Sequence, residues 1–250
     1  MTAAAAMLGP ASAKDARVPG DAGLSHVGMV RSRNEDALVR RPGDRFWAVA
    51  DGMGGLERGD WAAQLLAGAL RGVTLRGALA ADAEAVADAI QASNGAICRQ
   101  SEAQGAAIGS TVVALLMREA RFAVLWAGDS RAYRLRVGVL EQLSRDHTQV
   151  QDRVDRGYMT SEEARTHPMA HVLTRAVGVT PSLQLDVLYG DVEAGDVFLL
   201  CSDGLHGVAS DAEIAEGMAS GSPEDACARL LALCLERGAP DNVTLVAVTA

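Results

Sequence analysis

The sequence has very little lysine, and it lacks the glycine patterns of the common nucleotide-binding sites. Lys14 is the only lysine in the 250 residues, so the lysine-containing P-loop motif GxxxxGK[ST] has no candidate. The glycine-rich stretch DGMGGLERGD does not contain the GxGxxG pattern of a dinucleotide site. P-loop kinases and ATPases and Rossmann enzymes are therefore excluded.

Paired cysteine motifs are also absent. The four cysteines, Cys98, Cys201, Cys227 and Cys234, form no CxxC pair, and none is followed by an arginine at the spacing of a cysteine-phosphatase loop. Cys227 and Cys234 are seven positions apart, which places them on one face of a helix. We therefore expect reduced, buried thiols rather than disulfides or zinc ligands.

Long apolar runs and a basic leader are missing as well. No window approaches the run of about 18 apolar residues that spans a membrane, and the first residues do not resemble a secretory signal. Acidic residues outnumber basic ones 32 to 23, and a net charge of −9 argues against nucleic acid or anionic membrane as the main partner. We expect a cytoplasmic monomer with a flexible tail over residues 1–20 and one domain over residues 21–250.

The hydrophobic residues, 49% of the chain, are enough for a sizeable core, and their periodicity gives an order of elements. Short runs rich in β-branched residues follow one another directly, which favours antiparallel sheets over parallel winding. The predicted strands are Ala22–Val30, Phe46–Ala50, STVVALLMRE, RFAVLWAGD, RAYRLRVG, LQLDVLYGDV, DVFLLCSD and NVTLVAVTA, and the predicted helices are Gly59–Val73, Asp82–Gln104, Asp211–Ala219 and Pro223–Arg237.

This order predicts an α+β fold with four layers. Each of the two helix pairs can cover the outer face of one of two stacked antiparallel sheets, giving an αββα sandwich. The polar segment 146–177 is poor in strand-forming residues and is predicted to lie outside the sandwich as a flap.

Carboxylates stand at equivalent places along this pattern. Asp51, Asp129, Asp203 and Asp241 lie at the ends of apolar strands, and Glu35 and Asp36 follow the first strand. Each aspartate alone is most often a turn residue. Packing the strands brings these ends to one edge, where like charges repel and lose water unless cations neutralise them. Oxygen ligands suit Mg²⁺ or Mn²⁺, whereas zinc favours the His and Cys clusters that the chain lacks.

The motifs around these residues resemble a known family. RSRNEDA, VADGMGG, GST, WAGDSRAYR, LSRDHT, LTRAVG, LLCSDGL and DNVTLV occur in family order over about Gly23 to Val248. Together they are similar to the bacterial branch of the metal-dependent protein serine/threonine phosphatases, the PPM or protein phosphatase 2C family. The fold of that family agrees with the four layers expected above.

The resemblance implies a role for each carboxylate. Asp51 would bridge two metal ions, with the Gly52 carbonyl contributing to one of them, and Asp203 and Asp241 would complete the shell of the other. Glu35 and Asp36 would act through metal-bound water. Asp129 would hold a third, weaker ion. Two ions lower the pKa of a shared water, so the nucleophile would be water and no phosphoenzyme would form.

Arginine and histidine positions follow from the same resemblance. Arg31 matches the arginine that binds the substrate phosphate, and Arg131 is expected to be structural. Met53 stands where eukaryotic members carry a candidate general acid, and methionine cannot donate a proton. A water on a metal ion or His147 are substitutes, although a lone histidine is more often a packing residue. His171 and Arg175 of the flap are candidates for substrate contact.

The implied activity is hydrolysis of phosphoserine and phosphothreonine in proteins, opposing a bacterial serine/threonine kinase, with Arg31, Asp51, Asp203 and Asp241 as the catalytic residues. The rival interpretation is a phosphatase-like module that binds phosphoprotein or a signalling partner without turnover. Loss of a metal-binding aspartate would favour the module, and all the expected positions are filled.

Overall fold

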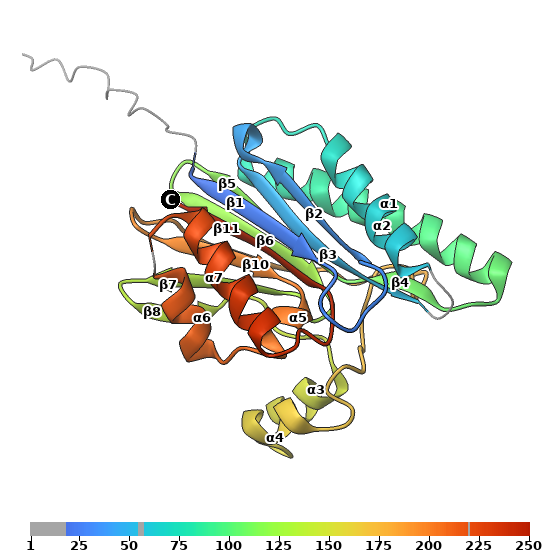
Figure 1. Ribbon diagram of the computed structural model, residues 1–250. Helices are drawn as coiled ribbons and strands as arrows, with labels where there is room; N and C mark the ends of the chain where they lie inside the picture. Colours follow the sequence, from blue (N-terminus) through green and yellow to red (C-terminus); the bar gives the residue numbers. More distant parts are fainter. Residues whose placement is uncertain (1–18, 55–57, 220) are drawn as a thin grey trace, which may run out of the picture.

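The computed structural model describes residues 19–54, 58–219 and 221–250. Most of the predicted N-terminal tail, residues 1–18, lies outside the described residues. Two antiparallel sheets lie face to face at the centre of the molecule, with helices on both outer sides (Figure 1). No helix among the described residues combines the length and the apolar character needed to cross a membrane.

The first sheet combines strands from both ends of the described chain. Its order is β1 (Asp21–His26), β11 (Val243–Thr249), β10 (Val197–Cys201), β7 (Arg131–Arg136) and β8 (Val139–Gln142). The second sheet has the order β2 (Asp36–Arg41), β3 (Phe46–Gly54), β5 (Val112–Arg118), β6 (Arg121–Ala127) and β9 (Asp186–Asp191), and β4 (Ile108–Ser110) pairs with the end of β3. A short 3₁₀ turn, η1 (Pro42–Asp44), connects β2 to β3.

Apolar side chains point alternately to the two faces of each sheet, so both faces are buried. Large buried residues such as Trp47, Phe122 and Phe198 belong to the core between the sheets. The outer face of the second sheet packs against α1 (Gly59–Gly72) and α2 (Leu79–Gln104). The outer face of the first sheet packs against α6 (Asp211–Met218) and α7 (Pro223–Glu236). The four-layer αββα prediction is therefore confirmed.

The other three helices of the described residues are short. α5 (Asp203–His206) follows β10 directly, whereas α3 (Gln149–Asp155) and α4 (Ser161–Thr166) project from the sandwich (Figure 1). The two ends of segment 146–177 run antiparallel and form a neck. In this neck Gln149 N–H donates to Val172 O at 2.9 Å and Thr174 N–H donates to His147 O at 2.8 Å.

Some strand predictions were wrong in their extent. The first strand ends at His26 rather than Val30, because the chain turns there and Met29 N–H donates to Ala239 O. Strands β2, β4 and β8 were not predicted. The strand containing Phe46 continues to Gly54, so Asp51 lies within β3 and not after its last residue. Pairing with β2 and β4 explains the extension, since both neighbours supply backbone partners beyond Ala50.

Candidate active site

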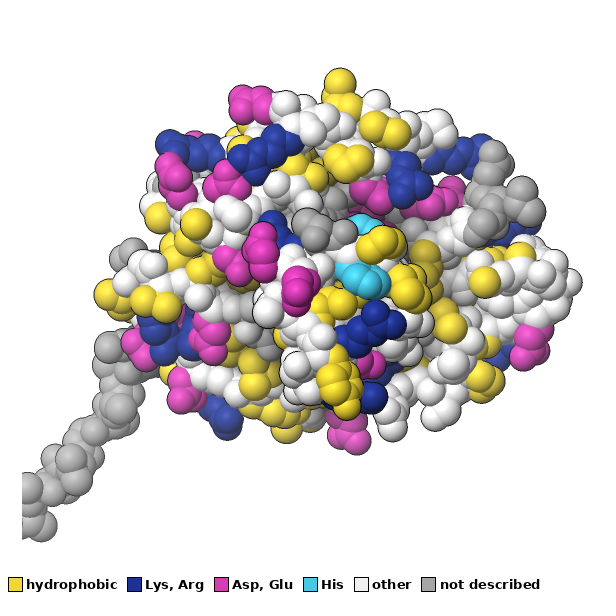
Figure 2. Space-filling view, turned by 90° about the horizontal axis from the view of Figure 1, so that it is seen from below, with side chains coloured by type: hydrophobic (Ala, Val, Ile, Leu, Met, Phe, Trp, Pro, Cys, Tyr) yellow, Lys and Arg dark blue, Asp and Glu magenta, His cyan; other side chains and the backbone are white. Residues whose placement is uncertain are grey.

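One cavity of about 400 Å³ collects most of the predicted site residues at the end of the sandwich next to the flap. Its lining includes Arg31, Glu35, Asp51, Gly52, Met53, Asp129, His171, Asp203 and Asp241. Asp36 is not part of the lining but lies directly opposite Asp51 in the pairing of β2 with β3. The face of the molecule seen from below shows histidine side chains at the surface among hydrophobic, acidic and arginine side chains (Figure 2).

Asp51 is held by two hydrogen bonds to Thr111, which lies beside β3. Its N–H donates to the Thr111 hydroxyl at 3.1 Å, and Thr111 N–H donates to Asp51 O at 2.8 Å. The next residue must be glycine, since a Cβ on Gly52 would lie 2.1 Å from Gly59 O at the start of α1. This close approach fixes the strand against the helix and keeps Asp51 at the cavity wall.

Asp36 lies behind Asp51 and is 5% exposed. Its Oδ2 accepts the Ser202 hydroxyl at 2.9 Å, whereas Oδ1 has no hydrogen-bond partner among the described residues. Glu35 lies at the cavity and its N–H donates to Asn242 Oδ1 at 2.7 Å. The two acidic residues of the RSRNEDA motif therefore occupy different levels, one lining the cavity and one beneath it.

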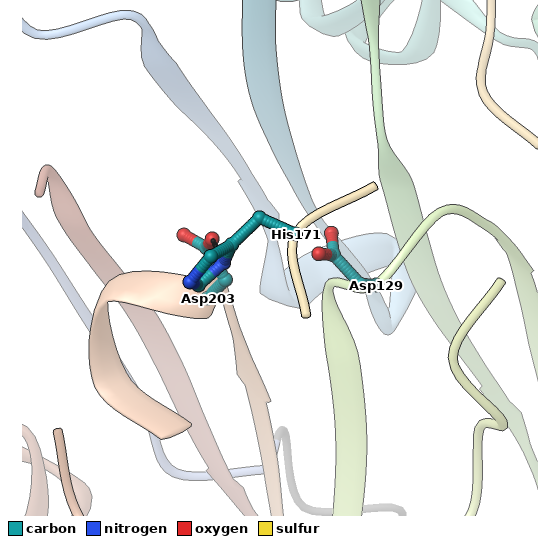
Figure 3. A group of neighbouring side chains, drawn as sticks. All are labelled: Asp129, His171 and Asp203. Carbon is teal, nitrogen blue, oxygen red and sulfur yellow. Dashed lines mark ion pairs between the residues drawn. The ribbon is translucent and has the colours of Figure 1, made fainter. Parts of the chain in front are cut away.

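Asp129, His171 and Asp203 form a group at the flap side of the cavity (Figure 3). One potential ligand atom from each of the three side chains lies within 4.8 Å of the others, and His171 Nδ1 is 3.3 Å from Asp203 Oδ2. Asp203 begins α5, Asp129 follows β6, and His171 comes from the neck of the flap. Three separate segments thus contribute to one group of oxygen and nitrogen donors.

Burial and mutual repulsion raise the pKa values of several carboxylates at the site. Burial and the nearby Asp203 and Asp241 carboxylates raise the pKa of Asp36 to about 6. Burial and the Asp203 and Asp146 carboxylates raise the pKa of Asp129 to about 8. Burial and four neighbouring carboxylates hold the pKa of Asp51 well above its usual value. Without added positive charge, the group therefore retains protons at neutral pH.

Asp203 differs from its neighbours. Burial alone would raise the pKa of Asp203, but a hydrogen bond from His171 and the nearby imidazoles of His206 and His171 bring the pKa below its usual value. The surroundings therefore favour the negative charge on Asp203, whereas burial and the neighbouring carboxylates disfavour it on Asp51.

These observations fit a site for hard divalent cations. The donors are predominantly carboxylate oxygens, which suit Mg²⁺ and Mn²⁺. The unpaired Oδ1 of Asp36 and the raised pKa values of Asp51 and Asp129 are two independent signs of a missing positive charge. The residues present are therefore suited to hold the ions that the sequence motifs imply.

Arg31 lies at the mouth of the cavity, with its side chain 56% exposed. Its Nη2 donates to Asp241 Oδ2 at 2.7 Å, so the arginine and one predicted metal ligand form an exposed ion pair. Screening by water keeps such a pair weak, and the guanidinium remains available for an anionic ligand.

Three other predicted positions are not part of the cavity lining. Arg131 donates to the Asp146 carboxylate from Nε at 2.9 Å and from Nη2 at 2.7 Å, which agrees with its expected structural role. His147 is 2% exposed and is not part of the cavity lining, so its position favours packing over proton donation. Arg175 donates to Asp186 Oδ1 at 2.6 Å and likewise does not line the cavity.

Sequence reasoning missed Asn242, which organises the loops around the site. Its Nδ2 donates to Val27 O at 2.8 Å and to Arg33 O at 2.9 Å, while its Oδ1 accepts from Glu35. It therefore holds the loop that carries Arg31 and Glu35. The only signal in the sequence was its place next to Asp241 in DNVTLV.

Comparisons with known proteins agree with this geometry. The family model described as protein phosphatase 2C matches residues 22–242. The serine/threonine protein phosphatase PstP of Mycobacterium tuberculosis is 40% identical over 233 residues, which cover 90% of this chain and 44% of that protein. This chain therefore spans less than half the length of that relative.

Solved structures show the same fold. The structure of PppA from Pseudomonas aeruginosa has a TM-score of 0.87 and 42% identity, with 93% of this chain and 97% of that chain covered. The catalytic domain of PstP in complex with two manganese ions has a TM-score of 0.82 and 37% identity, with 93% and 98% covered.

Proposed function

Because this chain belongs to the protein phosphatase 2C family, we propose that it hydrolyses phosphoserine and phosphothreonine in proteins with the help of bound Mn²⁺ or Mg²⁺. One observation carries the proposal: carboxylates from separate strands converge on a cavity that has an exposed arginine at its mouth. A phosphorylated side chain needs both cations and a guanidinium to balance its charge.

Asp51, Gly52, Asp203 and Asp241 would hold two ions, and Asp129 would hold a third with Asp203 and His171. When bound, such ions lower the pKa of water and counter the negative charge of the phosphoryl group. The two manganese ions in the related catalytic domain of PstP support the two-ion part of this assignment.

The side chains of this chain would then bind and orient the substrate. Arg31 would leave Asp241 and bind two phosphate oxygens, since a planar guanidinium matches that geometry. Glu35 at the cavity would act on the ions through water, and buried Asp36 would keep Asp51 in register. Met53 lines the cavity without a transferable proton, so we propose that water protonates the leaving alcohol.

The proposal extends to the cellular setting. The substrates would be proteins phosphorylated by a cognate serine/threonine kinase, and the enzyme would act as a cytoplasmic monomer. The four cysteines are free and buried, which suits a reducing compartment.

Hydrolysis of p-nitrophenyl phosphate and of a phosphothreonine peptide tests the proposal. We expect activity with Mn²⁺, its loss in EDTA, and its loss in Asp51→Asn. Activity that persists in EDTA would refute the metal-dependent reaction. A wild-type protein that binds the phosphopeptide without hydrolysing it would instead identify a phosphoprotein-binding module.

A further inference from the structure

His147 is buried and makes hydrogen bonds through its ring and its backbone. The ring Nδ1 of His147 accepts the Gly128 N–H at 3.1 Å, and the backbone N–H of His147 donates to Gly128 O at 3.0 Å. Because Nδ1 is an acceptor, the proton of the neutral ring is on Nε2, which lies 3.2 Å from Asp186 Oδ2. Both ring nitrogens are therefore used inside the protein.

The far side of the ring is fixed by residues of the second sheet and the flap. Asp186 begins β9 and also accepts the Arg175 guanidinium at 2.6 Å. Trp126 stacks on the imidazole with ring centroids 6.2 Å apart and an angle of 14°. The orientation of His147 is thus set independently of the residue that it contacts through Nδ1.

That residue, Gly128, forms the turn that carries Asp129. Its φ of +115° strongly favours glycine, and an added Cβ would lie 2.6 Å from the Thr111 side chain. The residues after the glycine have their own contacts, because the Ser130 hydroxyl lies 2.6 Å from the Thr111 hydroxyl and His206 Nε2 lies 3.0 Å from Asp129 O. The N–H of Gly128 donates to the His147 ring and its carbonyl accepts the backbone N–H of His147, so this histidine supplies the hydrogen bonds that hold the glycine itself.

We propose that His147 is a positioning residue that holds the Gly128–Asp129 turn, so that the Asp129 carboxylate faces the third cation position shared with His171 and Asp203. This inference rests on the proposed function. The flap neck supports it, because Thr174 N–H donates to His147 O and His171 lies on the same strand of the neck. The flap therefore reaches the Asp129 position through both ends of its neck.

Two substitutions separate the contacts of the ring. In His147→Asn the amide oxygen can replace Nδ1 as acceptor for Gly128 but cannot reach Asp186. In His147→Gln the amide nitrogen can replace Nε2 as donor to Asp186 but leaves Gly128 N–H without its partner. His167→Gln is the matched control, since the Nδ1 of this flap histidine accepts only the Met169 N–H within the flap.

The readout is Mn²⁺ binding, measured from the electron paramagnetic resonance signal of free Mn²⁺. We expect His147→Gln to weaken the weakest class of bound Mn²⁺ by about tenfold or more, the size typical of a lost supporting hydrogen bond. His147→Asn and His167→Gln should remain close to the wild type. Equal Mn²⁺ binding in the two His147 variants would overturn the proposal.

Leaving-group dependence distinguishes positioning from proton donation. A general acid matters most for a basic leaving group, so its loss would slow hydrolysis of phenyl phosphate far more than that of p-nitrophenyl phosphate in both variants. We expect similar ratios for the two esters, and a selective loss for phenyl phosphate would overturn the positioning role. If the wild type binds Mn²⁺ but hydrolyses neither ester, the proposed function fails, and the Mn²⁺ affinities still decide the role of His147.

Discussion

The substitution Asp129→Asn is expected to stabilise the metal-free protein as pH rises. Burial and the carboxylates of Asp203 and Asp146 raise the pKa of Asp129 to about 8, against about 3.9 in an unfolded chain. Between these values the folded protein binds more protons than the unfolded chain. The contribution of Asp129 to stability is therefore present below the lower value and is lost as pH rises through the higher one.

The magnitude follows from this difference in pKa. The Asp129 residue is 6% exposed, so water screens it little. At about 1.4 kcal/mol per pKa unit, the loss at pH 7 reaches about 4 kcal/mol as an upper limit. Asparagine has nearly the same shape and no charge, so the variant does not suffer this loss. Any packing cost of the amide is the same at each pH.

Urea unfolding in EDTA at pH 4.5 and pH 8 measures the effect. The free energy of unfolding of Asp129→Asn minus that of the wild type should grow by at least about 2 kcal/mol between the two pH values. Mn²⁺ at about 100 times its Kd should reduce this difference by about 2.7 kcal/mol, since bound ligand stabilises only the protein that binds it. A difference that stays constant with pH would refute the reasoning.

Further predictions concern the substrate, the metal ions and the fold. Arg31→Ala should lower kcat/KM for a phosphothreonine peptide by about 10- to 100-fold, and an unchanged value would contradict phosphate binding. Asp51→Asn should lose the rise in Tm that Mn²⁺ gives the wild type, and a retained rise in a calorimetric scan would exclude Asp51 as a ligand. Asp82 is 1% exposed and accepts Arg118 Nε at 2.7 Å and two backbone N–H groups. Asp82→Ala should therefore cost about 3 kcal/mol in urea unfolding, and a loss under about 1 kcal/mol would contradict its role.

The helices that cover the sheets could be predicted closely from the sequence. The first was expected over Gly59–Val73 and is found over Gly59–Gly72, and the last was expected over Pro223–Arg237 and is found over Pro223–Glu236. These helices have a local signal, because one apolar stripe faces a sheet along their whole length. Ser222 and Asp225 also form a capping box at the start of the last helix.

Strand β2 had no comparable signal. Its sequence, DALVRR, begins and ends with charged residues. Arg40 and Arg41 find their partners in Asp21 and Asp44, and the strand forms because β3 lies beside it. Only the three-dimensional arrangement supplies these partners, so alternation along six residues did not predict the strand.

The candidate site was predictable where it depends on strand ends and not where it depends on the flap. An aspartate after an apolar strand is visible in the sequence, and Asp51, Asp129, Asp203 and Asp241 do converge on one cavity. The approach of His171 to Asp203 depends on the pairing within the flap neck, which joins segments more than twenty residues apart. No local pattern reports that pairing.

The placement of β11 has a consequence for how the protein is made. This strand lies between β1 and β10, and Asp241 and Asn242 immediately precede it. During translation, β1 leaves the ribosome first among the described strands, and its partner in the sheet, β11, is synthesised last. A nascent chain that stops before residue 241 would therefore lack both Asp241 and an interior strand of the first sheet. The cavity that Asp241 lines can therefore form only after the last strand of the first sheet has been synthesised.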